Sequence, residues 1–118
     1  MKKIIIAEDT ERIRKKLVEL IGTLYDGIQI DSVVDGKDLV DKVKENDYCV
    51  VLTDNRMVGW SGIRATEEIR KFNEKVPIYL MSSDTVSDSI IKKIGATGFI
   101  YKEDMLSEIP SILNPYLK

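Results

Sequence analysis

The sequence has no histidine, only one cysteine and only three prolines among its 118 residues. Without histidine the chain has no imidazole base, lacks the usual zinc ligand and cannot carry a phosphohistidine of its own. A single cysteine, Cys49, excludes a disulfide scaffold. No apolar run approaches the roughly 20 residues of a membrane-spanning helix, so we expect a cytoplasmic protein that makes no membrane contact. Any chemistry must use carboxylates, hydroxyls and lysines.

The charged residues are nearly balanced and evenly spread. Twenty acidic and 18 basic side chains are interleaved, so no basic arm predicts nucleic-acid binding. A chain of this length with 43% hydrophobic residues can bury one ordinary core. No linker rich in glycine, proline or serine and no repeat interrupts it. We therefore expect a single domain over residues 1–118, without an attached effector domain.

Short apolar runs alternate with segments of helical periodicity. The predicted strands are Lys3 to Ala7, Ile28 to Val33, Tyr48 to Thr53, Ile78 to Met81 and Phe99 to Tyr101. They lack a clean polar and apolar alternation, which is typical of parallel strands covered on both faces. The order of elements predicts five βα units, and hence a doubly wound α/β fold around a parallel sheet.

Some helix ends are marked by capping residues. Asp35 and Ser61 precede the second and third helical segments and can accept hydrogen bonds from free amides of the first turn. In the last segment, Ser107 as the cap would place Pro110 in the first turn, where its missing N–H costs little. Pro115 would then end or kink the helix. We expect a short or bent final helix.

Polar side chains follow four of the predicted strands. Glu8 and Asp9 follow the first strand, whereas Asp54, Ser82 and Lys102 follow the third, fourth and fifth. Ligands of doubly wound sheets bind beyond the carboxyl ends of the strands, so we expect one cluster there. Taken singly, each residue could equally be a helix cap or a solvated loop residue. Their coincidence at four strand ends favours a site.

The chemistry of this cluster indicates a magnesium-dependent phosphoacceptor. Three converging carboxylates would repel one another unless a cation neutralised them, and Mg²⁺ prefers such hard oxygen ligands. With phosphate present, an oxygen of Asp54 can attack phosphorus in line and form an acyl phosphate. Lys102 can bind a phosphoryl oxygen or counter the acidic charge, and the Ser82 hydroxyl can hydrogen-bond another phosphoryl oxygen.

Four motifs resemble the receiver domains of two-component response regulators, and the resemblance covers essentially the whole chain. The motifs are IIIAED, VLTDNRMVGWSG, IYLMSSD and GATGFIYKE. The resemblance implies a flavodoxin-like fold with five parallel strands in the order 2-1-3-4-5 and five helices. In its length, the chain looks like the stand-alone chemotaxis and phosphorelay regulators.

The resemblance also implies a role for individual residues. Asp54 would be the phosphoacceptor, and Lys102 would pair with the phosphoryl group. Ser82 would be the switch hydroxyl and Phe99 the switch aromatic. The magnesium ligands would be oxygen atoms of Glu8, Asp9, Asp54 and the backbone carbonyl of Arg56.

The implied mechanism is a shift between two conformations. The phosphoryl group would draw Ser82 inward, and Phe99 would turn into the space that opens. This movement would change the surface of the fourth helix, fifth strand and fifth helix, which would contact a downstream protein or a second copy. A histidine kinase or histidine phosphotransfer protein would donate the phosphoryl group. We expect a switch rather than an enzyme.

The chain departs from the family pattern at two positions. Val58 and Glu103 stand where the family usually has proline, and a trans peptide bond is the default before Glu103. Trp60 lies in the loop after Asp54, where we expect it to anchor the loop on neighbouring apolar surface.

Arg56 and Asp84 occupy positions that, in receivers, flank the path of a water molecule. That water hydrolyses the aspartyl phosphate. We expect the two side chains to pair across the mouth of the pocket and to slow that water. The alternative is that they are two exposed charges that rarely meet, because surface pairs are typically weak.

Other functions remain as alternatives. The chain could be a receiver-like interaction module that is never phosphorylated. A magnesium-dependent phosphohydrolase with an aspartyl-phosphate intermediate is disfavoured, because that family has a second aspartate where this chain has Arg56. Flavin or nucleotide binding is weaker still, because no glycine-rich loop follows the first strand.

Overall fold

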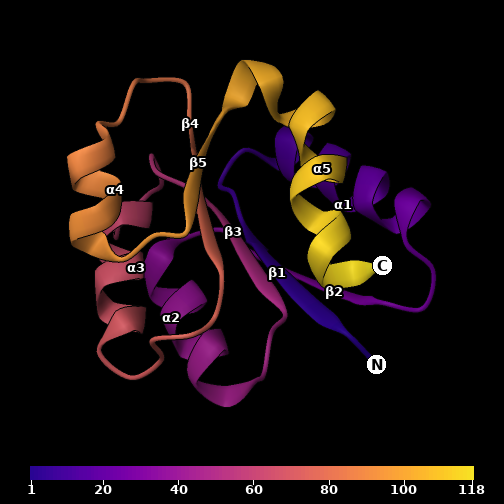
Figure 1. The fold of residues 1–118 in the computed structure, drawn as a ribbon, viewed down its shortest axis with the longest axis horizontal. Coiled ribbons are helices and arrows are strands. Elements are labelled where there is room, and N and C mark those ends of the chain that lie inside the picture. The colour runs from indigo at the N-terminus through magenta and orange to yellow at the C-terminus, as the bar shows by residue number, and fades with distance from the viewer.

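The computed structural model describes all residues, 1–118, and contains a five-stranded parallel sheet in the order β2-β1-β3-β4-β5. The strands are β1 (Lys3–Ala7), β2 (Gln29–Val33), β3 (Val50–Asp54), β4 (Ile78–Ser82) and β5 (Gly98–Tyr101). The sheet runs through the middle of the molecule, with α1 and α5 on one face and α2, α3 and α4 on the other (Figure 1). The predicted fold class and strand order are confirmed.

Five helices connect and follow the strands. They are α1 (Glu11–Leu24), α2 (Gly36–Glu45), α3 (Gly62–Arg70), α4 (Asp88–Ile94) and α5 (Met105–Leu117). Both predicted caps are confirmed, because Asp35 accepts the Asp38 N–H at 2.8 Å and Ser61 accepts the Arg64 N–H at 3.1 Å. None of the helices combines the length and the apolar character that crossing a membrane requires.

The last helix differs from its prediction. It begins at Met105, after a short 3-10 turn, so Ser107 is not its cap and instead donates from Oγ to the Asp104 carbonyl at 2.9 Å. The helix also continues through Pro110 and Pro115 for 13 residues. Its buried side chains recur at every fourth position: Met105, Ile109, Leu113 and Leu117. Their packing against the sheet offsets the hydrogen bonds that the prolines remove.

An apolar core fills each face of the sheet because alternate strand residues point to opposite faces. On the α1 and α5 side it includes Ile4, Ile6, Leu17, Ile21, Leu52, Ile100, Ile109 and Leu113. On the α2 and α3 side it includes Ile5, Leu39, Val43, Val51, Ala65, Ile69 and Ile78. Every residue of the central strand β3 is buried, including its last residue, Asp54. Asp54 therefore sits on one of the most firmly held parts of the chain.

Gly62, at the start of α3, packs against the end of β3. A Cβ at this position would overlap the carbonyl oxygen of Asp54 and lie 2.8 Å from Leu80 Cδ1. Although alanine is the better helix former, we expect Gly62→Ala to lower the free energy of unfolding by about 1–3 kcal/mol, because backbone cannot move aside cheaply. Urea denaturation measures this change.

Gly22→Ala is the matched control, since Gly22 is also a helical glycine. A Cβ there would meet only Ile30 Cδ1, at an ordinary 3.8 Å. The control should raise the free energy of unfolding by roughly 0.5–1 kcal/mol through helix propensity alone. Equal stabilisation by both substitutions would contradict the close packing of Gly62 beneath Asp54.

Candidate functional site

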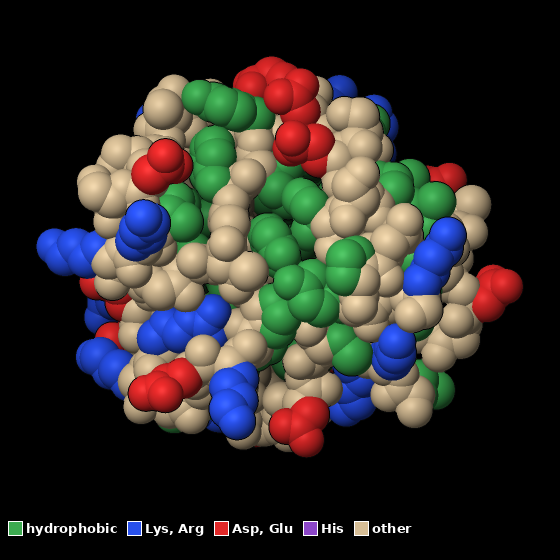
Figure 2. All heavy atoms as spheres, viewed as in Figure 1, with side chains coloured by type: hydrophobic (Ala, Val, Ile, Leu, Met, Phe, Trp, Pro, Cys, Tyr) green, Lys and Arg blue, Asp and Glu red, His purple; other side chains and the backbone are tan.

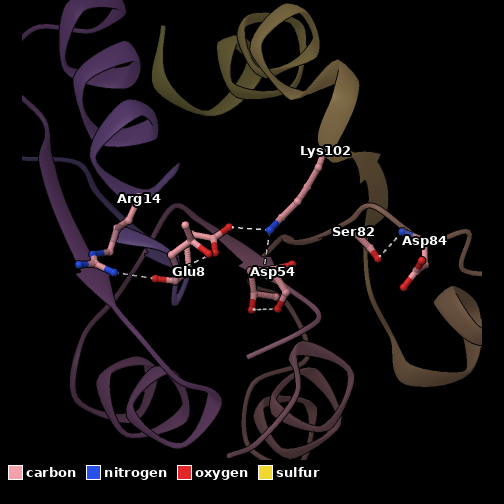
Figure 3. A network of polar contacts seen from close by, with 8 residues as sticks. Glu8, Arg14, Asp54, Ser82, Asp84 and Lys102 are labelled. Carbon is pink, nitrogen blue, oxygen red and sulfur yellow. Dashed lines mark hydrogen bonds and ion pairs between the residues drawn. The ribbon is translucent and has the colours of Figure 1, made fainter. Parts of the chain in front are cut away.

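Four strands bring polar side chains to the same edge of the sheet. Asp54 and Ser82 are the last residues of β3 and β4, whereas Glu8 and Lys102 directly follow β1 and β5. Strands of a parallel sheet all point the same way, so their carboxyl ends lie together. Figure 3 shows Glu8, Asp54 and Lys102 converging, with Ser82 at the end of the neighbouring strand. The predicted convergence is therefore present in the structure.

Lys102 bridges two buried carboxylates. Its Nζ lies 2.9 Å from Glu8 Oε1 and 2.9 Å from Asp54 Oδ2, to which it donates a hydrogen bond (Figure 3). The side chains of Glu8 and Asp54 are 0% and 4% exposed, and that of Lys102 is 16% exposed. Burial by itself would lower the pKa of Lys102, but contacts with Asp54 and Glu8 outweigh it, and the pKa is raised. The lysine is held in its charged form.

Glu8 has one buried oxygen without a hydrogen bond. Its Oε2 accepts the Thr10 N–H at 3.1 Å, whereas Oε1 faces the Lys102 ammonium without hydrogen-bond geometry. Burial raises the pKa of Glu8, and its contacts with Lys102 and Thr10 only partly oppose that rise. A buried carboxylate oxygen whose one partner is a lysine ammonium, without a hydrogen bond, is able to coordinate a cation as well.

Glu8, Asp9 and Asp54 form an acidic cluster. Each offers one carboxylate oxygen, and these oxygens lie within 4.8 Å of one another. One lysine cannot balance three negative charges, so the cluster keeps an excess of negative charge near the sheet edge. Oxygen donors at this spacing fit a hard divalent cation. Coordination by the backbone carbonyl of Arg56 stays a prediction.

A hollow of about 490 Å³ opens beside the cluster. Its lining residues come mainly from the loop between β3 and α3: Asp9, Asn55, Arg56, Met57, Val58 and Ser61. Trp60 anchors this loop as predicted, because its side chain packs against the apolar core on the α2 and α3 side. Its carbonyl also accepts the Gly36 N–H at 3.2 Å, and the Arg64 guanidinium lies 3.9 Å from its ring centre. The loop that borders the acidic cluster is thus tied to α2 and α3.

Ser82 does not contact the cluster directly. The residue is 2% exposed, and its hydroxyl accepts the Asp84 N–H at 3.0 Å (Figure 3). The Asp84 side chain forms an ion pair with Arg56, although both side chains are largely exposed. The predicted pairing is therefore present, whereas its effect on hydrolysis stays a prediction. The Ser82 hydroxyl thus lies next to the Arg56–Asp84 ion pair.

Two features of the site differ from the sequence-based expectation. The sequence did not predict a contact for Arg14, whose guanidinium donates to the Glu8 carbonyl at 2.9 Å. Its position in the first turns of α1 is the one sequence feature that indicates this hydrogen bond. Phe99 is only partly buried and Tyr101 is 36% exposed, although both belong to an apolar run that predicts a strand covered on both faces. They lie on β5, an edge strand that neighbouring elements cover incompletely.

Glu8→Gln should change how the stability of the metal-free protein depends on pH. Because burial raises the folded-state pKa of Glu8, ionising it disfavours the folded state. Below the unfolded pKa of about 4.3, Glu8 is protonated in both states and the variant should match the wild type. As pH rises through the folded pKa, the wild type should lose free energy of unfolding relative to the variant.

The measurement is urea denaturation in EDTA at a series of pH values. Glu103→Gln, at an exposed glutamate after β5, is the matched control and should follow the wild type throughout. A constant difference between Glu8→Gln and the wild type across the series would show that burial does not govern Glu8 ionisation.

Comparison with known families identifies the class of domain. A family model described as the response regulator receiver domain matches residues 4–114. The chain is 30% identical over 103 residues to the chemotaxis protein CheY of Halobacterium salinarum, covering 86% of this chain and 84% of that protein. It is also 30% identical over 117 residues to the uncharacterized transcriptional regulatory protein YkoG of Bacillus subtilis, covering 93% of this chain. This chain spans only 50% of YkoG.

Solved structures share the fold over nearly the whole chain. The response regulator TrrA of Thermotoga maritima, crystallised in complex with Mg(2+)-BeF, has a TM-score of 0.86 at 26% identity and covers 99% of this chain and 100% of its own. In a second crystal structure TrrA is in complex with the histidine kinase ThkA, with a TM-score of 0.85 at 27% identity and full coverage of both chains, 100% and 100%.

Proposed function

Because this chain belongs to the response regulator receiver domain family, we propose that it is the phosphoacceptor switch of a two-component phosphorelay. Asp54 takes a phosphoryl group from the histidine of a kinase or phosphotransfer protein. The observation that carries the proposal is the Lys102 ammonium, which lies 2.9 Å from both Asp54 and Glu8 at the buried end of the sheet. Residues 1–118 act as one receiver domain in this proposal, and a cytoplasmic location stays a prediction.

We assign the acidic cluster to Mg²⁺. Glu8, Asp9, Asp54 and the backbone carbonyl of Arg56 would hold the ion, and the buried Glu8 Oε1 without a hydrogen bond supports this assignment. When bound, Mg²⁺ neutralises the carboxylates and the incoming phosphoryl oxygens. The complex of TrrA with Mg(2+)-BeF supports the choice of metal by analogy.

The transfer needs little rearrangement of the protein. An Asp54 oxygen attacks phosphorus in line, the P–N bond of the donor phosphohistidine breaks, and the imidazole leaves with the bonding electrons and is reprotonated. The Lys102 ammonium is already within 2.9 Å of Asp54 Oδ2, so it can hydrogen-bond a phosphoryl oxygen as charge develops there. Burial of Asp54 keeps bulk water from competing with the donor.

Phosphorylation then favours a second conformation. The Ser82 hydroxyl must turn toward the phosphoryl oxygen, and Phe99 follows into the space that it leaves. A switch from mostly inactive to mostly active needs about 5.5 kcal/mol of differential binding, which several charge-assisted hydrogen bonds and a metal contact can supply. Phosphate thus acts as a ligand that prefers one state.

The output surface in this proposal comprises α4, β5 and α5. Apolar side chains gather between α4 and α5 in Figure 2, and Ile90, Tyr101 and Leu106 on these elements are exposed. A downstream protein or a second copy would bind there. The complex of TrrA with ThkA supports a histidine kinase as the phosphodonor. YkoG is described as a transcriptional regulatory protein, but nothing in this domain suggests direct contact with nucleic acid.

Incubation with acetyl phosphate tests the phosphoacceptor. Intact-mass measurement should find a single phosphoryl adduct on the wild type in Mg²⁺ and none in EDTA, because the metal must offset repulsion between the two anions. Asp54→Ala should give no adduct in either condition. Asp26→Ala removes an exposed carboxylate from the turn after α1 and should be modified like the wild type. A folded wild type without any adduct would favour the interaction module that is never phosphorylated.

Arg56→Ala tests whether the ion pair with Asp84 shields the acyl phosphate. Opening the pair should speed hydrolysis about twofold to fivefold, in line with the modest strength of exposed ion pairs. Loss of the phosphoryl adduct over time, after the donor is removed, gives the rate. Lys15→Ala opens another exposed ion pair, with Glu11 on α1, and should leave the rate unchanged. An unchanged rate in Arg56→Ala would rule out the shielding role.

A further inference from the structure

The loop between β4 and α4, residues 83–87, is held by side-chain contacts on both sides. On one side Asp84 pairs with Arg56 of the β3–α3 loop. On the other side the Thr85 hydroxyl lies 2.7 Å from the Tyr101 hydroxyl of β5. Within the loop, the Asp84 N–H donates to Ser82 Oγ at 3.0 Å. The loop that directly follows Ser82 is thus connected to the β3–α3 loop and to β5.

Tyr101 occupies a central position among the switch residues. It is paired with Ser82 in the register of β4 and β5, and it directly precedes Lys102. Its ring meets that of Phe99 edge-to-face, with centroids 5.1 Å apart and planes inclined by 77°. Tyr101 and Phe99 share a face of the strand because they are two residues apart. Tyr101 therefore adjoins the serine and lysine positions through the backbone and the Phe99 position through its ring.

We propose that the Thr85–Tyr101 hydrogen bond is a latch that stabilises the unphosphorylated conformation. This inference rests on the proposed function. If Ser82 moves toward a phosphoryl group on Asp54, the loop that follows it moves as well. The ladder pairing with Ser82 keeps the Tyr101 backbone in register with β4 while residues 83–87 shift, so the bond to Thr85 lengthens beyond about 3.5 Å and breaks.

The latch also restrains Phe99. With its hydroxyl held by Thr85, the Tyr101 ring stays in edge contact with the Phe99 ring. A turn of Phe99 must break that contact or move Tyr101 with it. Tyr101 is thus a positioning residue that acts through Ser82 and Phe99 and touches no reacting atom. The strength of the latch sets how much more strongly the phosphoryl group must interact with the second conformation to shift the equilibrium.

Tyr101→Phe tests the latch, because it removes the hydroxyl and keeps the ring. The probe is beryllofluoride with Mg²⁺, which mimics the phosphoryl group on Asp54, and calorimetric titration gives its affinity. Loss of one hydrogen bond that opposes the switch should raise this affinity about threefold to tenfold. Thr85→Val should raise it by the same factor. The double variant should match each single variant, since both changes remove the same bond.

Tyr79→Phe is the matched control. It also removes one hydroxyl-to-hydroxyl contact, the one at 2.8 Å between Tyr79 of β4 and Tyr116 of α5. It should alter the melting temperature without altering beryllofluoride affinity. Unchanged or weaker affinity in Tyr101→Phe would overturn the latch, and so would full additivity of the Tyr101 and Thr85 variants.

A second readout separates failure of the latch from failure of the proposed function. If the wild type binds no beryllofluoride in Mg²⁺, the proposed function fails. Hydrogen exchange of the metal-free proteins then tests the latch by itself. The amides of residues 83–87 should exchange faster in Tyr101→Phe and in Thr85→Val than in the wild type, and at the same rate in both variants. Exchange as slow as in the wild type would overturn the inference.

Discussion

The site depends on one ammonium group held between two buried carboxylates. Lys102 follows β5, whereas its partner Asp54 ends β3 and its partner Glu8 follows β1, so its side chain must cross the end of β4. Neighbouring strands are about 4.8 Å apart, so two spacings, roughly 10 Å, separate β5 from β3, and the extended Lys102 and Asp54 side chains together span them. β4 ends in the small residue Ser82, which leaves room for the crossing. The contact between Lys102 and the two carboxylates therefore requires the sheet order, the long lysine side chain and the small Ser82 together.

Burial makes the cluster of Glu8, Asp54 and Lys102 sensitive to any added charge. Glu8 and Asp54 have lost most of their solvent, and a single lysine cannot satisfy both of them together with Asp9. Charges in such a setting interact more strongly than they do in water. In the proposed function, a cation and then a phosphoryl group would supply the missing partners. A small chemical change can in this way alter the balance of forces at four strand ends at once.

The loops around the site connect it to neighbouring elements. The β3–α3 loop is anchored by Trp60, and the β4–α4 loop is joined to it through Arg56 and Asp84. The same β4–α4 loop reaches β5 through Thr85 and Tyr101. Surface contacts of this kind are individually weak, so they can break without unfolding the domain. A firm sheet with lightly fastened loops is a suitable construction for a two-state switch.

The sequence alone determined the sheet, because its signals are local. They are apolar runs of strand length, capping residues such as Asp35 and Ser61, and polar residues directly after strands. The convergence of Glu8, Asp54 and Lys102 also followed, since parallel strands share one carboxyl edge. Only tertiary structure decided that α5 runs through Pro110, because packing of its apolar stripe outweighs backbone propensity. Likewise, the exposure of Tyr101 and its bond to Thr85 depend on how far α4 covers an edge strand, a long-range property that no local pattern contains.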